Sequence, residues 1–339
     1  MTNLSRRHFI GYSAAATATT VLSSCASNSY KVTHAQGLPV SSYGASSTAE
    51  DVTDGMDLSG KVAFITGCNS GIGLETMRVL ALRGAHVIGT GRTLEKAQKA
   101  CDSVSGKTTP VTLELSNLGS VVNCANRVKE LNLPIDMLIL NAGIGSYGEF
   151  QLINGIERYF HINYLGHFLL ANHLLPLVQS ADHGRIVHVG SQMGYSSVPP
   201  EGIDFDNLRG EKSFDSELAY GRSKLANALL SFQLSKQINS TQATSNVIHP
   251  GFVKTNIARS APAFVRIAFD MFGSAIAKTP AQGAATQTYV ATAPALAGVS
   301  GAYFEDCNPV TINGLHYFTD AAMADKLWRV STEMCKGFL

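Results

Sequence analysis

Short apolar segments alternate with helical segments from residue 58 onward, and this alternation constrains the fold more than any other feature of the chain. Each apolar segment has the length of a buried strand and ends at glycine or a small polar residue. The predicted strands are residues 61–66, 84–90, 109–115, 135–140, 185–190 and 244–249. The pattern indicates an α/β fold with a doubly wound parallel sheet of the Rossmann type, in a single domain over residues 58–339.

The first predicted strand runs into a glycine-rich turn, residues 67–73, that leads into a helix. Glycine lets the backbone approach a phosphate closely, and a helix N-terminus offers free N–H groups and a positive dipole end. The turn therefore predicts a dinucleotide-binding site, formed by Gly67, Asn69, Ser70, Gly71, Ile72 and Gly73. Any sharp turn between a strand and a helix favours glycine, so the position of this turn after the first strand is what supports the prediction.

The end of the second predicted strand indicates which dinucleotide is preferred. NAD-binding chains commonly place an acid there, against the ribose hydroxyls. This chain has Gly91 followed by Arg92, and an arginine can hold a 2′-phosphate that an acid would repel. We therefore expect NADP(H) as the cofactor, with NAD(H) the less favoured alternative.

Tyr220 and Lys224 lie four residues apart in a segment with helical periodicity, so they share one helix face. A nearby cation stabilises a phenolate, and we expect Lys224 to lower the pKa of Tyr220 from about 10 towards the range of a general acid or base. Alone, this spacing is common, and most Tyr–Lys pairs four residues apart are ordinary surface contacts.

Several motifs occur together in a characteristic order: residues 66–73, Asn141-Ala142-Gly143, Asn163, Ser191, Tyr220 with Lys224, and Pro250-Gly251. In this combination the chain resembles the classical short-chain dehydrogenase/reductase family from about residue 58 to its C-terminus. Residues 202–208, 220–227, 249–256 and 301–307 resemble the branch that contains retinol dehydrogenases, the WW-domain oxidoreductase and, more distantly, protochlorophyllide reductases.

The resemblance implies a role for each matching residue. Tyr220 would exchange a proton with the substrate oxygen, and Lys224 would also hold the nicotinamide ribose. Ser191 would hydrogen-bond the substrate oxygen, and Asn163 would hold a water that relays protons to Lys224. The remaining cofactor contacts implied are Leu115, Asn141, Ala142, Gly143, Pro250 and Thr255, in addition to the glycine turn and Arg92. The chain departs from the family pattern at Leu140 and Glu114, where asparagine and aspartate are frequent.

The first 57 residues predict an export signal and a linker. Arg6 and Arg7 precede an uncharged Ala/Thr-rich run, which resembles a twin-arginine signal over residues 1–26, and residues 22–25 resemble a lipobox that would lipidate Cys25. A disordered tail is the alternative. Residues 27–57 are rich in Ser, Thr, Gly and Ala and predict a flexible linker. We expect a periplasmic or membrane-anchored bacterial protein if the signal is real, and a cytoplasmic one otherwise.

Composition excludes several other functions. The net charge of +1 and the scattered Lys and Arg argue against nucleic-acid binding. The six cysteines and ten histidines show no ligand spacing, so no metal is implied. Residues 256–278 are apolar and predict a lid over a lipophilic substrate, although a core helix or a membrane-surface helix would share this pattern.

Together these features predict an NADP(H)-dependent oxidoreductase that interconverts an alcohol and a carbonyl on a small lipophilic alcohol, aldehyde or ketone. Two alternatives remain: a catalytically silent NADP-binding sensor or scaffold, and an epimerase or isomerase of nucleotide sugars. The sequence leaves the oligomeric state undetermined.

Overall fold

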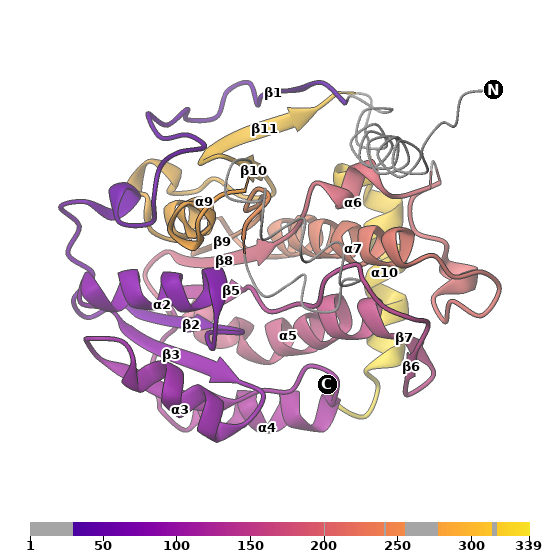
Figure 1. Ribbon diagram of the computed structural model, residues 1–339, viewed down its shortest axis with the longest axis horizontal. Helices are drawn as coiled ribbons and strands as arrows, with labels where there is room; N and C mark the ends of the chain where they lie inside the picture. The colour runs from indigo at the N-terminus through magenta and orange to yellow at the C-terminus, as the bar shows by residue number, and fades with distance from the viewer. Residues whose placement is uncertain (1–29, 200, 241, 255–276, 314–316) are drawn as a thin grey trace, which may run out of the picture.

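One nine-stranded sheet crosses the centre of the computed structural model, which describes residues 30–199, 201–240, 242–254, 277–313 and 317–339 (Figure 1). Its strand order is β1-β11-β10-β9-β8-β5-β2-β3-β4. The strands are β1 (Val32–His34), β2 (Val62–Ile65), β3 (His86–Gly91), β4 (Thr108–Thr112), β5 (Met137–Leu140), β8 (Gly184–Val189), β9 (Ala243–His249), β10 (Tyr303–Glu305) and β11 (Asn308–Ile312). Each of the six predicted strands is present, with ends shifted by a few residues.

All pairings from β4 to β10 are parallel, which agrees with the predicted sheet. The order runs outward from β2 through β3 to β4 on one side, and from β5 through β8 to β10 on the other. The chain therefore reverses its winding direction between β2 and β5. In open parallel sheets this switch point, at the carboxyl ends of the strands, is where ligands bind.

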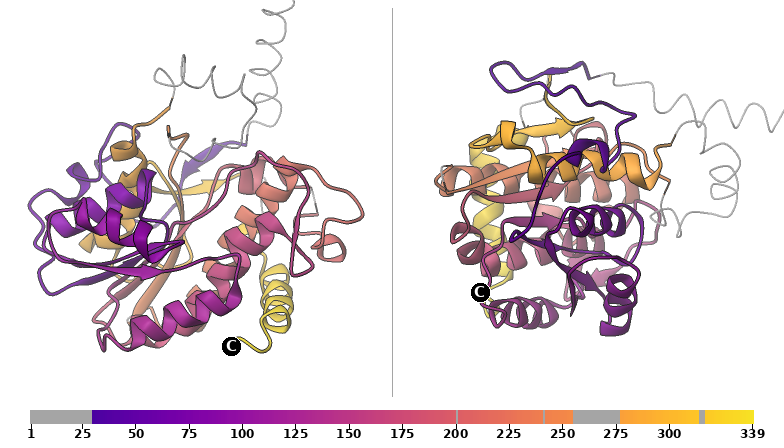
Figure 2. Two further views of the ribbon diagram at one scale, coloured as in Figure 1. Left: turned by 60° about the horizontal axis from the view of Figure 1, so that its bottom comes forward. Right: turned by 90° about the vertical axis from the view of Figure 1, so that its left-hand side faces the viewer.

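Helices cover both faces of the sheet, as Figure 2 shows. One buried cluster joins the sheet to α2 (Gly71–Leu82), α3 (Leu94–Asp102) and α9 (Pro280–Thr292). The other joins it to α4 (Leu118–Lys129), α5 (Gly166–Gln179), α7 (Ser216–Gln237) and α10 (Ala321–Met334). The short helix α6 (Met193–Ser196) packs against α7. A two-stranded hairpin, β6 (Leu152–Ile153) with β7 (Ile156–Glu157), precedes α5.

Capping side chains define where several helices begin. Thr93 accepts a hydrogen bond from the backbone N–H of Lys96 at the start of α3. Thr279 and Gln282 form a reciprocal capping box at the start of α9. Asp215 caps α7 by accepting from the backbone N–H groups of residues 217 and 218. These contacts satisfy first-turn donors that have no partner inside the helix.

The sheet extends beyond the prediction at one edge. β10 and β11 form an antiparallel hairpin, and β1 pairs antiparallel with β11, with Val32 opposite Ile312 (Figure 1). The predicted doubly wound parallel sheet is confirmed for the strands from β4 to β10, and these edge strands lie beyond it. Asp306 and Cys307 make the hairpin turn with φ of 48° and 63°, a left-handed conformation that their residue types seldom reveal in a sequence.

The prediction of a flexible linker over residues 27–57 is wrong for the part that the structure describes. Residues 30–57, here named the N-terminal strap, supply β1 and a single 3₁₀ turn, Asp51–Thr53. Ala49 and Val52 are fully buried, and the Ala49 backbone N–H donates to the carbonyl of Ala281 at 2.9 Å. A few small side chains are enough to fix the strap, because its backbone and polar groups bond to the folded domain.

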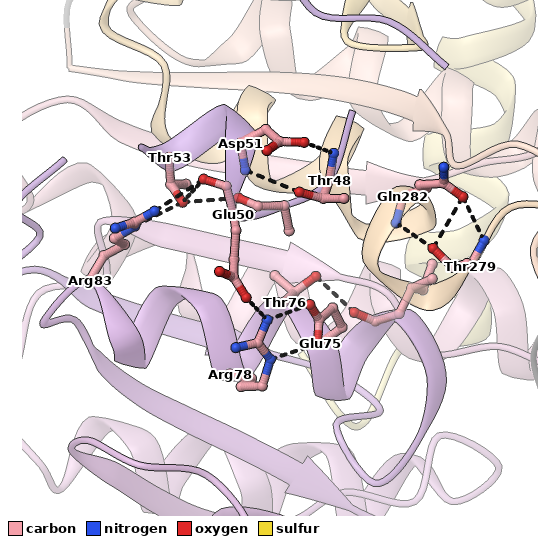
Figure 3. A network of polar contacts seen from close by, with 12 residues as sticks. Thr48, Glu50, Asp51, Thr53, Glu75, Thr76, Arg78, Arg83, Thr279 and Gln282 are labelled. Carbon is pink, nitrogen blue, oxygen red and sulfur yellow. Dashed lines mark hydrogen bonds and ion pairs between the residues drawn. The ribbon is translucent and has the colours of Figure 1, made fainter. Parts of the chain in front are cut away.

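Charged residues join the strap to α2 (Figure 3). Arg78 of α2 forms an ion pair with Glu50 of the strap and a second one, at 2.7 Å, with Glu75. Arg83 donates to the Thr53 hydroxyl at 3.2 Å and to the Glu50 carbonyl at 3.1 Å. The folded domain therefore includes residues upstream of the predicted boundary at 58.

The predicted export signal and most of the predicted lid lie outside the described residues. Residues 1–29, including Arg6, Arg7 and Cys25, lie outside the described chain, as do residues 255–276 of the predicted lid. The five described cysteines are buried and unpaired. Within the described ranges, no group of three His, Cys, Asp or Glu side chains is arranged to hold a metal, and no helix has the length and apolarity to span a membrane.

Candidate active site

The turn between β2 and α2 is shaped to receive a phosphate-bearing ligand. Gly67 and Gly71 have φ of 74° and 63°, which glycine adopts without strain. A Cβ atom on Gly73 would lie 2.4 Å from both the Gly67 carbonyl oxygen and the Asn141 amide nitrogen. Ser70 precedes α2 without a side-chain capping bond, so the first-turn N–H groups remain available to an anion. These observations fit a dinucleotide pyrophosphate.

The loop after β5 packs directly on this turn. The backbone N–H groups of Asn141 and Ala142 donate to the Thr66 hydroxyl at 2.8 and 2.9 Å. The Asn141 side-chain amide donates to the Thr66 carbonyl at 2.8 Å, while its buried Oδ1 has no protein partner among the described residues. A Cβ atom on Gly143 would lie 3.1 Å from Asn163 Oδ1, a tight contact that the Asn163 side chain would have to relieve by a small shift.

Arg92 follows β3 and lines the same cavity with an exposed side chain. A Cβ atom on Gly91 would lie 2.7 Å from the Ala97 backbone nitrogen, which explains why glycine stands where an acid is common. The nearby Glu114 accepts hydrogen bonds from the Ser116 backbone N–H at 3.1 Å and from its hydroxyl at 2.8 Å. Arg92 and Glu114 thus both line the cavity, and the Glu114 carboxylate is already hydrogen-bonded to Ser116.

Tyr220 and Ser191 come together because α6 lies close to α7. A Cβ atom on Gly221 would lie 2.2 Å from the Ser197 carbonyl oxygen, so glycine lets the two helices touch. Ser191 Oγ accepts from the Met193 backbone N–H at 3.2 Å. Burial raises the pKa of Tyr220 to about 12, and a hydrogen bond with the Ser191 side chain partly offsets that rise. Tyr220 is therefore protonated at neutral pH.

Lys224 does not act on Tyr220 in the predicted way. Its Nζ donates to the Val189 carbonyl at 2.9 Å and lies 5.6 Å from the centroid of the Tyr220 ring. Burial lowers the pKa of Lys224 to about 8, since the ammonium has lost most of its hydration. The predicted lowering of the Tyr220 pKa is wrong for this structure because desolvation outweighs the distant charge.

Asn163 lies behind the cavity wall, in a π-helical turn over Phe160–Leu165. Its Oδ1 accepts from the Ile144 backbone N–H at 2.8 Å, and its Nδ2 donates to the Ile144 carbonyl at 3.2 Å and to the Ser223 hydroxyl at 3.1 Å. Both amide protons are thus used to hold the loop after Gly143 against α7. The predicted water relay through Asn163 stays a prediction.

These elements enclose a cavity of about 460 Å³ at the switch point of the sheet. The predicted residues that line it are Gly67, Asn69, Ser70, Gly71, Ile72, Gly73, Arg92, Leu115, Asn141, Ala142, Gly143, Ser191, Tyr220, Lys224 and Pro250. Thr255 lies outside the described residues. The structure therefore brings the predicted proton-transfer residues and the predicted cofactor residues to one space.

Sequence reasoning did not identify some lining residues: Ile144, Tyr147, Gln192, Met193, His249 and Phe252. They share one signal, because each lies within a few residues of the carboxyl end of a strand. His249 ends β9, and its Nδ1 accepts from the Gln192 backbone N–H at 3.3 Å. Burial, with the charges of Lys278 and Lys224, lowers the pKa of His249 to about 4, so it is neutral at pH 7.

Comparison with known proteins supports one family. The family model described as short chain dehydrogenase matches residues 61–202. The short-chain dehydrogenase TIC 32 B, chloroplastic, of Brassica napus is 39% identical over 309 residues, which cover 87% of this chain and 94% of that protein. Retinol dehydrogenase 14 of Homo sapiens is 36% identical over 296 residues, covering 81% and 86%. A crystal structure of an uncharacterized protein from Mycobacterium paratuberculosis has a TM-score of 0.66 and 28% identity, covering 84% of this chain and 97% of that one.

Proposed function

The chain belongs to the short-chain dehydrogenase/reductase family, in the branch that contains retinol dehydrogenases, and from that premise we propose that it is an NADP(H)-dependent oxidoreductase that interconverts a lipophilic alcohol and the corresponding carbonyl. One observation carries the proposal. Tyr220, Lys224 and Ser191 line the same cavity as the glycine turn, so a proton donor and a dinucleotide would meet there.

The proton transfer to the substrate would be carried out by side chains of the protein. In the direction of reduction, the Tyr220 hydroxyl donates its proton to the substrate oxygen, and the Ser191 hydroxyl fixes that oxygen by a hydrogen bond. Lys224 lines the same cavity and would hold the nicotinamide ribose, while its Nζ donates to the Val189 carbonyl. Asn163 keeps the loop of Ile144 in place beside these groups. The nicotinamide, when bound, supplies the hydride in this direction and accepts it in the other.

Charge at the far end of the cavity supports NADP(H) over NAD(H). Gly91 stands where an acid would bind ribose hydroxyls, Arg92 follows it and lines the cavity, and the carboxylate of Glu114 accepts hydrogen bonds from Ser116. A guanidinium can hold a 2′-phosphate through charge-assisted hydrogen bonds.

A lipophilic substrate is supported by the described wall near Tyr220. Ile144, Met193 and Phe252 line the cavity together with Tyr220, and the charged side chains among its described lining residues are Arg92, Glu114 and Lys224. Beside the three apolar side chains, a charged or highly hydroxylated substrate would lose hydration without gaining matched partners.

Replacing Tyr220 by phenylalanine tests the chemistry. We expect Tyr220→Phe to lower kcat by at least about 10²-fold, the range of general acid catalysis, while the dissociation constant for NADPH stays within about twofold. Tyr159→Phe is the matched control, because Tyr159 is buried with its ring edge-on to Tyr220 but does not line the cavity. The assay follows NADPH oxidation with a panel of aldehydes and ketones.

The outcomes of this assay separate the alternatives. Full activity of Tyr220→Phe refutes the mechanism. NADPH binding without turnover on any panel member would support a sensor or scaffold. Inversion of a sugar carbon in a nucleotide sugar without net NADPH consumption would support an epimerase.

Replacing Arg92 by glutamate tests the cofactor. We expect Arg92→Glu to raise the KM for NADPH by about 10–100-fold and to leave the KM for NADH unchanged or lower, since the new charge repels only the 2′-phosphate. Lys96→Glu is the control, because Lys96 is an exposed cation in the first turn of α3 that does not line the cavity. Equal effects of Arg92→Glu on both cofactors would contradict the NADP assignment.

We also propose export by the twin-arginine route, with lipidation of Cys25. Because the strap is part of the folded domain, the signal should lie within residues 1–29. A reporter fused to these residues should reach the periplasm, and changing Arg6 and Arg7 to lysine should retain it in the cytoplasm. Labelling of the full chain but not of Cys25→Ala by a fatty-acid probe would support the anchor, and equal labelling would contradict it.

A further inference from the structure

His167 joins two parts of the site without lining the cavity. It lies in the first turn of α5 and is 1% exposed. Its Nε2 lies 3.0 Å from the Thr66 hydroxyl, at the end of β2. Its Nδ1 lies 3.1 Å from the backbone carbonyl oxygen of Asn163, one turn earlier. One imidazole thus connects the dinucleotide turn with the turn that holds Asn163.

The hydrogen-bond partners determine which ring nitrogen carries the proton. The Thr66 hydroxyl oxygen accepts from two backbone N–H groups, those of Asn141 and Ala142, which occupy both of its lone pairs. Thr66 must therefore donate its own proton, and His167 Nε2 receives it. The proton of the ring then lies on Nδ1, which donates to the carbonyl of Asn163.

A charged imidazole does not fit this arrangement. A proton on Nε2 would face a hydroxyl whose lone pairs are already used, and the Thr66 hydroxyl would lose its acceptor. The charged and titratable groups that face the ring are Lys224 and His188. Burial, reinforced by the charge of Lys224, lowers the pKa of His167 to about 4, so the neutral ring persists at pH 7.

Each end of the ring controls a different function. The Nε2 end fixes Thr66, which orients the loop of Asn141 and Ala142 against the glycine turn. The Nδ1 end holds the π-helical turn of Asn163, in which the Gly166 backbone N–H bonds to the carbonyl of His161, five residues earlier. π-helical turns are rare and occur often at functional sites.

The Nδ1 end is also connected to Tyr220, through hydrogen bonds of Asn163 and Ser223. Asn163 Nδ2 donates to Ser223 Oγ at 3.1 Å, and Ser223 Oγ donates to the Tyr220 backbone carbonyl at 2.6 Å. A displacement of Asn163 would therefore be transmitted to Tyr220, whereas a displacement of Thr66 would be transmitted to the dinucleotide turn.

We propose that His167 is a positioning residue that aligns the dinucleotide turn with the proton-transfer residues, with Nε2 serving cofactor binding and Nδ1 serving turnover. This proposal deepens the oxidoreductase function proposed above and rests on it. Substrate does not touch His167, whose effect passes through Thr66 and Asn163.

Two amide substitutions separate the ends of the ring. Asparagine places an amide nitrogen near the position of Nδ1, and glutamine places an amide oxygen near the position of Nε2. We expect His167→Asn to keep kcat within about threefold and to raise the NADPH dissociation constant by about tenfold, the scale of one lost hydrogen bond. We expect His167→Gln to keep the NADPH dissociation constant within about threefold and to lower kcat by about tenfold. His167→Leu should both lower kcat and raise the NADPH dissociation constant.

Tyr164→Phe is the matched control. Tyr164 lies in the same π-helical turn and is buried, but its hydroxyl bonds Ser331 of α10 at 2.7 Å, on the side away from the cavity. It should lower the melting temperature without changing kcat or the NADPH dissociation constant by more than about twofold. Nucleotide binding is measured by protein fluorescence, independently of turnover.

The pattern of effects decides the proposal. The proposal is supported if His167→Asn mainly raises the NADPH dissociation constant and His167→Gln mainly lowers kcat. Parallel shifts in the two variants, or shifts no larger than those of Tyr164→Phe, would overturn it. Failure of the oxidoreductase function would appear differently, as NADPH binding by the unsubstituted protein without turnover of any panel member, and the nucleotide dissociation constants would then still test the Nε2 half.

Discussion

Replacing Lys224 by methionine should stabilise the protein and abolish its activity. Lys224 is 4% exposed, and its ammonium makes one hydrogen bond to another described residue, at 2.9 Å to the Val189 carbonyl. Methionine has a similar length and no charge, so it fills the same space without the cost of a desolvated ammonium. The substitution thus separates what the folded chain needs from what catalysis needs.

The magnitude follows from the pKa of Lys224. Burial lowers it from 10.5 to about 8, a shift of about 2.5 that corresponds to about 3 kcal/mol of destabilisation at pH 7. Methionine leaves the Val189 carbonyl without its donor, at a cost of about 1–2 kcal/mol. We therefore expect Lys224→Met to raise the free energy of unfolding by about 1–2 kcal/mol and kcat/KM to fall by at least about 10²-fold.

The pH dependence provides a second readout. Between about pH 8 and 10.5 the unfolded chain binds a proton at Lys224 that the folded chain does not, so the stability of the original protein gains from Lys224 as pH rises through this window. Lys224→Met lacks that gain. Urea unfolding at several pH values should show the advantage of the variant at pH 7 shrinking towards pH 10.5.

Lys61→Met is the control for the sign of the effect. Lys61 Nζ forms an ion pair at 2.9 Å with Asp136, which is 8% exposed, so its loss leaves a mostly buried carboxylate without a cation. We expect this variant to be destabilised by about 1–3 kcal/mol. Destabilisation by Lys224→Met at pH 7, or an advantage that does not depend on pH, would refute the reasoning.

Three further predictions concern the dinucleotide turn, the N-terminal strap and the buried histidines. Gly73→Ala should weaken NADPH binding at least about tenfold in calorimetry, because its Cβ would lie 2.4 Å from backbone, whereas Gly44→Ala, with nothing within 4 Å, should bind normally. Val52→Ala should lower the free energy of unfolding by about 2–3 kcal/mol, since Val52 is fully buried; no change would contradict a folded strap. Burial lowers the pKa of His167 to about 4 and of His188 to about 3, so both charge on unfolding below about pH 6.5. Stability should therefore fall between pH 6.5 and 4, by on the order of 3 kcal/mol for His167 alone, and His167→Leu should show a smaller fall.

Features that depend on local sequence were predictable. Glycine at 67, 71 and 73 after an apolar strand identifies the dinucleotide turn, because the backbone conformation there demands glycine. The position of Tyr220 four residues before Lys224 identifies the helix face directed to the cavity. The comparisons confirm the resemblance to the short-chain dehydrogenase/reductase family that these motifs indicated.

Features that depend on contacts between distant residues were not predictable. β1 pairs with β11, which lies about 280 residues away, and three residues of alternating exposure carry no signal of their own. The strap contains few large apolar side chains, yet Val52 is fully buried and Glu50 pairs with Arg78. Composition predicted disorder here because it counts apolar residues and cannot register a partner supplied by another part of the fold.

The pKa of Tyr220 shows the same limit within the site itself. The helical spacing correctly put Lys224 on the same face, but it could not show that the ammonium is directed to the Val189 carbonyl or that both groups are buried. Burial destabilises the phenolate and the ammonium together, so each is driven towards its neutral form. Neutral tyrosine is the form that would donate a proton to the substrate carbonyl in the proposed reduction, so burial of Tyr220 is compatible with that role.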